Sequence, residues 1–173
     1  MNLSAIACLS LANFALLIVA IVCFISKMNA RENVNINVVV DENGYLPEKA
    51  HSADAGFDLR TPESFTLPAH GTYAIDTKVH MLIPVNFCGV LISKSGLYIT
   101  KHISSTGLVD SLYTGTIKVG LENHSDIDIE FKAGDKVSQI VICNIPDTTL
   151  NIVDIVEVDE NARGDNGLES SGR

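Results

Sequence analysis

The chain has 173 residues, of which 46% are hydrophobic and only 6% aromatic, and its formal net charge is −9. This length suffices for one domain with a substantial core. The negative charge and the absence of any basic run argue against non-specific nucleic-acid binding, because that requires clustered Lys and Arg to neutralise phosphates. A single bound nucleotide is still compatible with this charge if a divalent cation offsets it.

Residues 5–26 form an apolar stretch without a charged side chain. As an α-helix this stretch would be ~33 Å long, enough to cross a bilayer. Lys27 and Arg31 follow it and nothing basic precedes it, which favours a cytoplasmic C-terminal domain and argues against a signal peptide. Met28 offers an alternative start, with residues 1–27 as an upstream extension. Residues 1–27 are therefore either a membrane anchor or a mis-assigned start.

Alternating hydrophobic side chains predict an all-β domain, a barrel or sandwich, over residues 28–159. The expected strands cover residues 35–40, 73–83, 117–121, 127–131, 137–145 and 150–158. Turn-forming sequences rich in Gly, Pro, Asn and Asp separate these runs. The one helix that the pattern allows in this domain is short and spans residues 95–101.

The last residues, 160–173, contain three Gly and one large apolar residue, so they cannot bury enough surface to order themselves. We expect a mobile tail here. Arg163 and the pair Ser170–Ser171 provide a guanidinium and two hydroxyls beside unhindered backbone amides, a combination that suits a polyphosphate. The alternative is a chain end with no role, which is common for such tails.

Four segments inside the domain combine charged or hydroxyl side chains with Gly. They are AGFDL (55–59), SKSGL (93–97), GLVDSLY (107–113) and AGDKVSQ (133–139). Each has a structural alternative, since Asp58 and Asp135 could cap turns and Asp110 could be an ordinary turn residue. The four cysteines show no spacing that indicates a metal site.

Taken in order with RGDNGLESSG (163–172), these segments resemble the five motifs of the trimeric dUTPase family, the deoxyuridine triphosphate nucleotidohydrolases. The resemblance covers residues 35–173. It implies a β jelly-roll and a homotrimer whose three active sites each take residues from more than one chain. It also implies hydrolysis of dUTP to dUMP and pyrophosphate, with Mg²⁺ bridging the triphosphate oxygens.

The resemblance makes Asp110 the catalytic carboxylate, which orients a water and accepts its proton as the water attacks the α-phosphate. It assigns the nucleoside to Gly107, Leu108, Val109, Tyr113 and Lys118. These residues belong to a predicted hairpin, 107–123, whose open end receives the nucleoside. Backbone groups there would pair with the uracil edge, and Tyr113 would pack beneath the deoxyribose and obstruct a 2′-hydroxyl.

The residues that the resemblance assigns to the triphosphate, and to the tail that closes over it, are Lys94, Ser95, Gly96, Gln139, Arg163, Leu168, Ser170 and Ser171. No direct protein ligand to Mg²⁺ is implied, and Asp58 would reach the metal through water. Lys94 stands where the family usually has Arg. Leu168 and Glu169 stand where it commonly has Phe and Gly, so we expect weaker closure of the tail.

Two other functions remain open on the sequence alone. One is a dCTP deaminase of the same superfamily, which would need a different acid–base arrangement around the base. The other is a catalytically weakened, membrane-tethered module that binds a nucleotide or a protein partner, for which the altered tail and the apolar residues 5–26 provide support.

Overall fold

The computed structural model describes residues 33–153. The hydrophobic helix predicted for residues 5–26 and the tail predicted for residues 160–173 lie outside the described residues. Within residues 33–153, no helix has the length and hydrophobicity needed to span a membrane. The chain divides into two units with the boundary between Val38 and Val39. All site residues predicted within the described range lie in the second unit.

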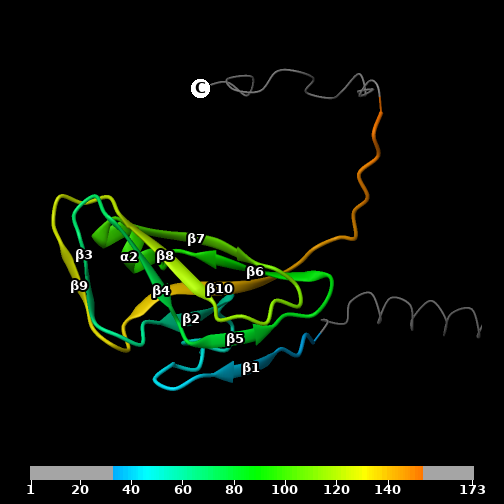
Figure 1. Ribbon diagram of the computed structural model, residues 1–173, viewed down its shortest axis with the longest axis horizontal. Helices are drawn as coiled ribbons and strands as arrows, with labels where there is room; N and C mark the ends of the chain where they lie inside the picture. Colours follow the sequence, from blue (N-terminus) through cyan, green and yellow to red (C-terminus); the bar gives the residue numbers. More distant parts are fainter. Residues whose placement is uncertain (1–32, 154–173) are drawn as a thin grey trace, which may run out of the picture. The chain divides into compact units, whose positions relative to one another are not determined.

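The described elements confirm the all-β prediction and the short helix at residues 95–101 (Figure 1). The strands are β1 (Asn37–Val40), β2 (Gly56–Arg60), β3 (Phe65–Leu67), β4 (Thr72–Asp76), β5 (Val79–Leu82), β6 (Phe87–Ile92), β7 (Ile103–Val109), β8 (Lys118–Asn123), β9 (Ile129–Phe131) and β10 (Lys136–Asn144). Helix α2 (Ser95–Lys101) connects β6 to β7.

Six of the strands form one antiparallel sheet in the order β2–β10–β6–β7–β8–β4. Two smaller sheets pair β1 with β5 and β3 with β9. Alternate side chains of the sheet strands point into the core, where Leu59, Val119 and Ile140 are fully buried. The period-2 pattern in the sequence therefore reports which strand face is buried.

The single strand predicted at residues 73–83 is wrong, because the structure has two strands there, β4 and β5. Lys78 lies between them with a φ of +61°. The Asp76 carboxylate stabilises this turn by accepting hydrogen bonds from the backbone N of Lys78 at 3.1 Å and from its Nζ at 3.3 Å. The turn lets β4 pair with β8 and β5 with β1. Ile75 and Val79 are both buried, so the alternation persists across the break.

The strand predicted at residues 150–158 is absent from its described part, residues 150–153. Leu150 is 96% exposed and Ile152 is fully exposed, so nothing in the described part of the chain covers them. Ile127, predicted to face the core, is also exposed, and β9 begins only at Ile129. An apolar pattern predicts that a residue will be covered but does not say by which surface.

The structure has a hairpin at the predicted place, but it begins at Ile103 and not at residue 107, and its strands separate toward the loop. β7 pairs with β8 only at Ser105↔Leu121 and the two pairs before it, Ser104↔Glu122 and Ile103↔Asn123. Beyond this point β7 follows β6 and β8 follows β4. The loop of residues 110–117 therefore spans an opening at the end of the sheet.

Candidate functional site

A pocket of about 240 Å³ occupies the open end of the β7–β8 hairpin. The predicted site residues that line it are Gly107, Leu108, Val109, Asp110, Tyr113 and Lys118. Leu91, Thr116 and Ile117 complete the lining. The structure thus brings the predicted catalytic carboxylate and all the predicted nucleoside-binding residues to one cavity.

This pocket combines apolar side chains with an unpaired strand edge. Val109 and Ile117 are buried and anchor its walls to the core, whereas Leu108 is 65% exposed. On the side away from β6, no other described strand pairs with β7 beyond Ser105. Backbone groups of an edge strand are available for pairing, so this edge can hydrogen-bond the edge of a base.

The loop that carries Asp110 is attached to the core at both ends. The backbone N of Leu112, which has a φ of +61°, donates to the Ile83 carbonyl at 2.8 Å. The Ser111 hydroxyl donates to the Phe87 carbonyl at 2.7 Å. At the other end, the Ile117 N–H donates to the Val79 carbonyl at 2.8 Å. Asp110 therefore starts from a fixed backbone.

Asp110 is exposed, and within residues 33–153 its carboxylate makes no hydrogen bond or ion pair. Only its backbone carbonyl takes part in the turn, as a weak acceptor from the Tyr113 N–H at 3.4 Å. The side chain is thus not used as a turn cap. It is free to contact a water or a ligand in the pocket.

Tyr113 lies against a glycine in the same loop. A Cβ added at Gly115 would be 2.3 Å from the Tyr113 hydroxyl oxygen, so only Gly accommodates the phenol in this position. The hydroxyl also makes a long contact, 3.5 Å, with the Thr116 carbonyl. The ring is 43% exposed and lines the pocket beside Asp110.

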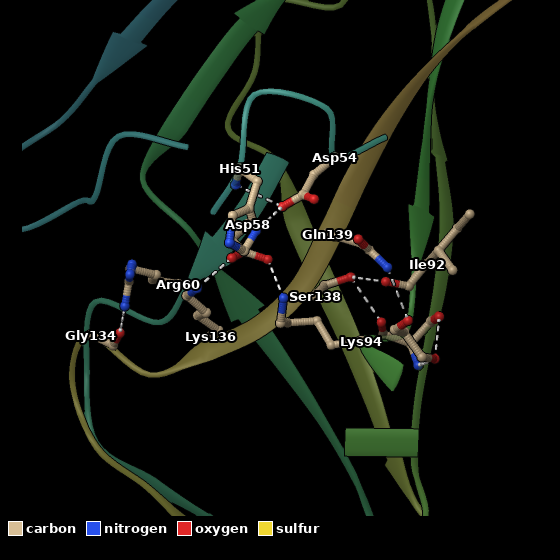
Figure 2. Close-up of polar contacts among 12 residues, drawn as sticks. His51, Asp54, Asp58, Arg60, Ile92, Lys94, Gly134, Lys136, Ser138 and Gln139 are labelled. Carbon is tan, nitrogen blue, oxygen red and sulfur yellow. Dashed lines mark hydrogen bonds and ion pairs between the residues drawn. The ribbon is translucent and has the colours of Figure 1, made fainter. Parts of the chain in front are cut away.

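A second cluster centres on Asp58, which lies on β2 and is only 6% exposed (Figure 2). Its two carboxylate oxygens form ion pairs with Lys94 and with Lys136, the latter at 2.6 Å. Burial raises the pKa of the Asp58 carboxyl, but hydrogen bonds and charge attraction from Lys136 and Lys94 outweigh burial and hold the pKa below its usual value. Asp58 is therefore ionised and binds two cations.

Lys136 was not among the site residues predicted from the sequence. It is the first residue of β10, and the register Lys136↔Arg60 brings it to the strand that carries Asp58. The ion pair of Lys136 with Asp58 cannot be predicted from the local GDKV sequence, because it depends on the register between β10 and β2. Asp135, in contrast, caps the preceding turn by accepting from the Lys132 N–H at 2.8 Å.

The other predicted phosphate-binding residues surround Lys94. The Gln139 amide donates to the Ser93 carbonyl at 3.4 Å, across the paired strands β10 and β6. Ser95 and Gly96 begin α2 and are exposed. A Cβ at Gly96 would meet nothing within 4 Å, so packing within the described residues does not require glycine there.

Asp110 and Lys94 lie toward opposite ends of β6. Val109, next to Asp110, is opposite Gly89, whereas Lys94 follows the far end of β6 beyond Ile92. Five residues of extended chain from Gly89 to Lys94 correspond to ~17 Å. We name the pocket at residues 107–118 the nucleoside half-site, after the ligand predicted for it from the sequence. We name the second cluster the phosphate half-site for the same reason; it consists of Asp58, Lys94, Ser95, Gly96, Lys136 and Gln139.

Four predicted contacts, Arg163, Leu168, Ser170 and Ser171, lie outside the described residues. No group of three or more His, Cys, Asp or Glu within residues 33–153 could hold a metal ion. A metal at the phosphate half-site would therefore need ligands from phosphate and water.

Comparisons with known proteins agree on one family. A family model described as dUTPase matches residues 42–172. The chain is 35% identical to the deoxyuridine 5′-triphosphate nucleotidohydrolase of Candida albicans over 131 residues, which are 75% of this chain and 82% of that protein. It is 36% identical to the protein of the same name from Saccharomyces cerevisiae over 128 residues, 73% of this chain and 86% of that one.

Solved structures give the same result. The dUTPase of Staphylococcus bacteriophage 80alpha with dUPNHPP superimposes with a TM-score of 0.74 at 26% identity, covering 80% of this chain and 99% of that one. A mutant dUTPase from phage phi11 of S. aureus, described as coordinating a structural Mg(II) ion, gives a TM-score of 0.66 at 26% identity, covering 72% and 99%.

Proposed function

This chain belongs to the dUTPase family, and on that premise we propose that it hydrolyses dUTP to dUMP and pyrophosphate by attack of water on the α-phosphate. The observation that carries the proposal is the pocket at residues 107–118, where an uncommitted carboxylate stands beside a phenol and an unpaired strand edge. These are the groups that water activation and recognition of a nucleoside require.

In this proposal Asp110 orients the attacking water and accepts its proton. A positioned general base contributes about 10²–10⁴-fold to a rate. Asp is a weak base at neutral pH, so fixing the water in line with the α-phosphorus and neutralising charge on the phosphates must supply much of the remaining acceleration. The anchored loop ends at Leu112 and Ile117 suit this positioning role.

Selectivity for deoxyuridine follows from the same pocket. The unpaired edge of β7 can present fixed donors and acceptors to the uracil edge, and cytosine would meet them with the wrong pattern. Exclusion of thymine would require that the lining leave no room for its methyl group. Tyr113, held against Gly115, would lie beneath the deoxyribose and obstruct a ribose 2′-hydroxyl.

Lys94, Ser95, Gly96 and Gln139 would contact the β- and γ-phosphates. Lys94 is paired with Asp58 in the described structure. To bind the triphosphate, the Lys94 ammonium must either contact a phosphate and Asp58 at the same time or leave Asp58 for the phosphate. Lys136 stays with Asp58 and keeps it compensated during the exchange. A single carboxylate beside a triphosphate suits Mg²⁺, which keeps phosphate and water ligands, with Asp58 reached through water. The metal would neutralise phosphate charge.

A complete site then needs two chains. Because Asp110 and Lys94 lie at opposite ends of β6, the nucleoside half-site of one subunit would meet the phosphate half-site of another. We propose the homotrimer of jelly-roll subunits that the family implies, with three such sites at its interfaces.

The direct test is release of pyrophosphate from dUTP in the presence of Mg²⁺, with dCTP, dTTP and UTP as comparisons. We expect rapid release from dUTP and much slower release from the other three. Ammonia release from dCTP without pyrophosphate would instead identify a deaminase, and binding of dUTP without turnover would identify a nucleotide-binding module.

The tail offers a separate prediction. Leu168 lacks the aromatic face that could stack on uracil, and Glu169 would bring a negative charge to phosphates if the tail closes over them. Changing Leu168→Phe and Glu169→Gly together is expected to lower KM for dUTP, because base stacking on an aromatic contributes about 1–3 kcal/mol. Steady-state kinetics of the double variant checks this, with Leu150→Phe as the control. An unchanged or higher KM would contradict it.

A further inference from the structure

His80, on β5, contacts the loop that carries Asp110 and Tyr113. Its Nδ1 lies 2.7 Å from the Thr114 carbonyl oxygen, and its Nε2 lies 3.1 Å from Oδ2 of Asp41. The imidazole is therefore a bridge between the loop and the residue that follows β1. Neither the sequence motifs nor the proposed chemistry uses this residue.

Both partners of the ring are acceptors. A carbonyl oxygen can only accept a hydrogen bond, and so can an ionised carboxylate. The two contacts can be hydrogen bonds at the same time only when both ring nitrogens carry a proton. A neutral imidazole has one N–H and would leave either Thr114 or Asp41 facing a lone pair. The geometry thus selects the imidazolium.

The surroundings of the ring also favour the charge. The hydrogen bond with the Thr114 carbonyl, followed by that with Asp41, raises the pKa of His80 above its ordinary value of 6.5, and attraction to Asp41 and Asp76 acts in the same direction. Lys78 faces Asp76 and is paired with it at 3.3 Å. Asp41 is itself fixed, because its N–H donates to the Lys78 carbonyl at 2.9 Å.

Thr114 is the residue on which the position of the phenol depends. The core holds the loop at residues 111–112 and at Ile117, but the segment between them has fewer outside contacts. Gly115, next to Thr114, is the surface on which Tyr113 rests. Fixing the Thr114 carbonyl therefore fixes the platform beneath the phenol.

We propose that His80, as an imidazolium, is a positioning residue that holds the 110–117 loop in its substrate-binding geometry by bridging the Thr114 carbonyl and the Asp41 carboxylate. This inference rests on the proposed function for its kinetic consequence. The direction in which the bridge depends on pH follows from the raised pKa of His80. A raised pKa means that the bridge is fully formed below pH 6.5 and is lost as the pH rises through the raised pKa.

The test compares His80→Ala with the wild-type protein across pH 6–9. At pH 6 the variant is expected to show a KM for dUTP about 2- to 5-fold higher, the range of a solvent-accessible ion pair, with little change in kcat. The ratio of the two KM values should approach one as the pH rises, because the wild-type imidazole then also loses the bridge. Asp41→Asn should move this transition to lower pH.

His70→Ala is the matched control. His70 pairs with the exposed Asp126 at 2.9 Å, and neither residue lines the pocket at residues 107–118. This variant is expected to match the wild type at every pH. A KM ratio for His80→Ala that is one at pH 6, or that does not vary with pH, would overturn the inference, the second result indicating a merely structural residue.

NMR titration of the His80 ring nitrogens in the full chain separates this inference from the proposed function. Two protonated nitrogens at pH 6.5 and a pKa above 6.5 support the bridge even if dUTP is not hydrolysed. A ring that is neutral at pH 6.5 would overturn the bridge even if the enzyme is fully active.

Discussion

Asp110→Asn is expected to lower kcat for dUTP by about 10²–10⁴-fold, the contribution of a positioned general base. The amide keeps the size of the side chain and its place in an anchored loop, so the pocket should stay intact. Since the Asp110 carboxylate makes no ion pair or side-chain hydrogen bond within residues 33–153, the change removes no described contact. Pyrophosphate release under single-turnover conditions measures the effect.

The control for the loss of kcat in Asp110→Asn is its affinity for nucleotide. A non-hydrolysable dUTP analogue should bind the variant with an affinity close to that of the wild type. Asp126→Asn makes the same chemical change at an exposed carboxylate on another loop and should leave kcat unaltered. If Asp110→Asn retained wild-type turnover, Asp110 would not be the base, and the proposed mechanism would be wrong.

Asp58→Asn should have the largest effect on stability. The substitution leaves Lys94 and Lys136 close together without the carboxylate that compensates them. Breaking a fully buried ion pair costs about 3–5 kcal/mol. Both lysine side chains are partly exposed, so water recovers part of this, and we expect the free energy of unfolding to fall by about 1–3 kcal/mol at pH 7.

The dependence on pH distinguishes the charge from simple packing. The pKa of Asp58 is lowered in the folded protein, so its stabilisation is present above the ordinary value of 3.8 and is lost as the pH falls through the lower folded value. The difference between wild type and variant should therefore be constant near neutrality and shrink in acid. Urea unfolding at pH 7, 5 and 3 measures it, with Asp126→Asn as the control. A difference that persisted unchanged at pH 3 would contradict this explanation.

Local sequence patterns predicted the elements well wherever the burial of a residue depends on its own strand. The alternation at 117–121 and 137–145 corresponds to β8 and β10, and the short helix at 95–101 is α2. The pocket could be predicted too, because Gly107, Asp110 and Tyr113 are close in sequence and one hairpin carries them all.

Two features could not be predicted from the sequence: the register of the paired strands, and which surface covers a given apolar residue. The cluster of Asp58, Lys94 and Lys136 joins β2, β10 and the segment after β6 through strand pairing that no local pattern specifies. The turn at Lys78 was not predicted, because the alternation of buried and exposed side chains continues across it. The strand predicted at residues 150–158 is absent from the described residues, where Leu150 and Ile152 are exposed. Their apolar side chains predict burial, but they do not predict which surface would bury them.

The bridge formed by His80 was also beyond reach of the sequence. Asp41, His80 and Thr114 are far apart along the chain, and of the three only Thr114 lies in a motif segment. They meet because β5 lies between the residue that follows β1 and the end of the 110–117 loop. A long-range contact of this kind depends on the packing of loops.

The division of the site between subunits can be measured by mixing two defective variants. Asp110→Asn damages only the nucleoside half-site, and Lys94→Ala damages only the phosphate half-site while leaving Asp58 paired with Lys136. When the two are unfolded together in equal amounts and refolded, about a quarter of the interfaces in random trimers should contain two intact halves. We expect the mixed sample to have a kcat/KM for dUTP well above the mean of the two separately refolded variants. Activity equal to that mean, in a sample that mass spectrometry shows to contain mixed trimers, would contradict it.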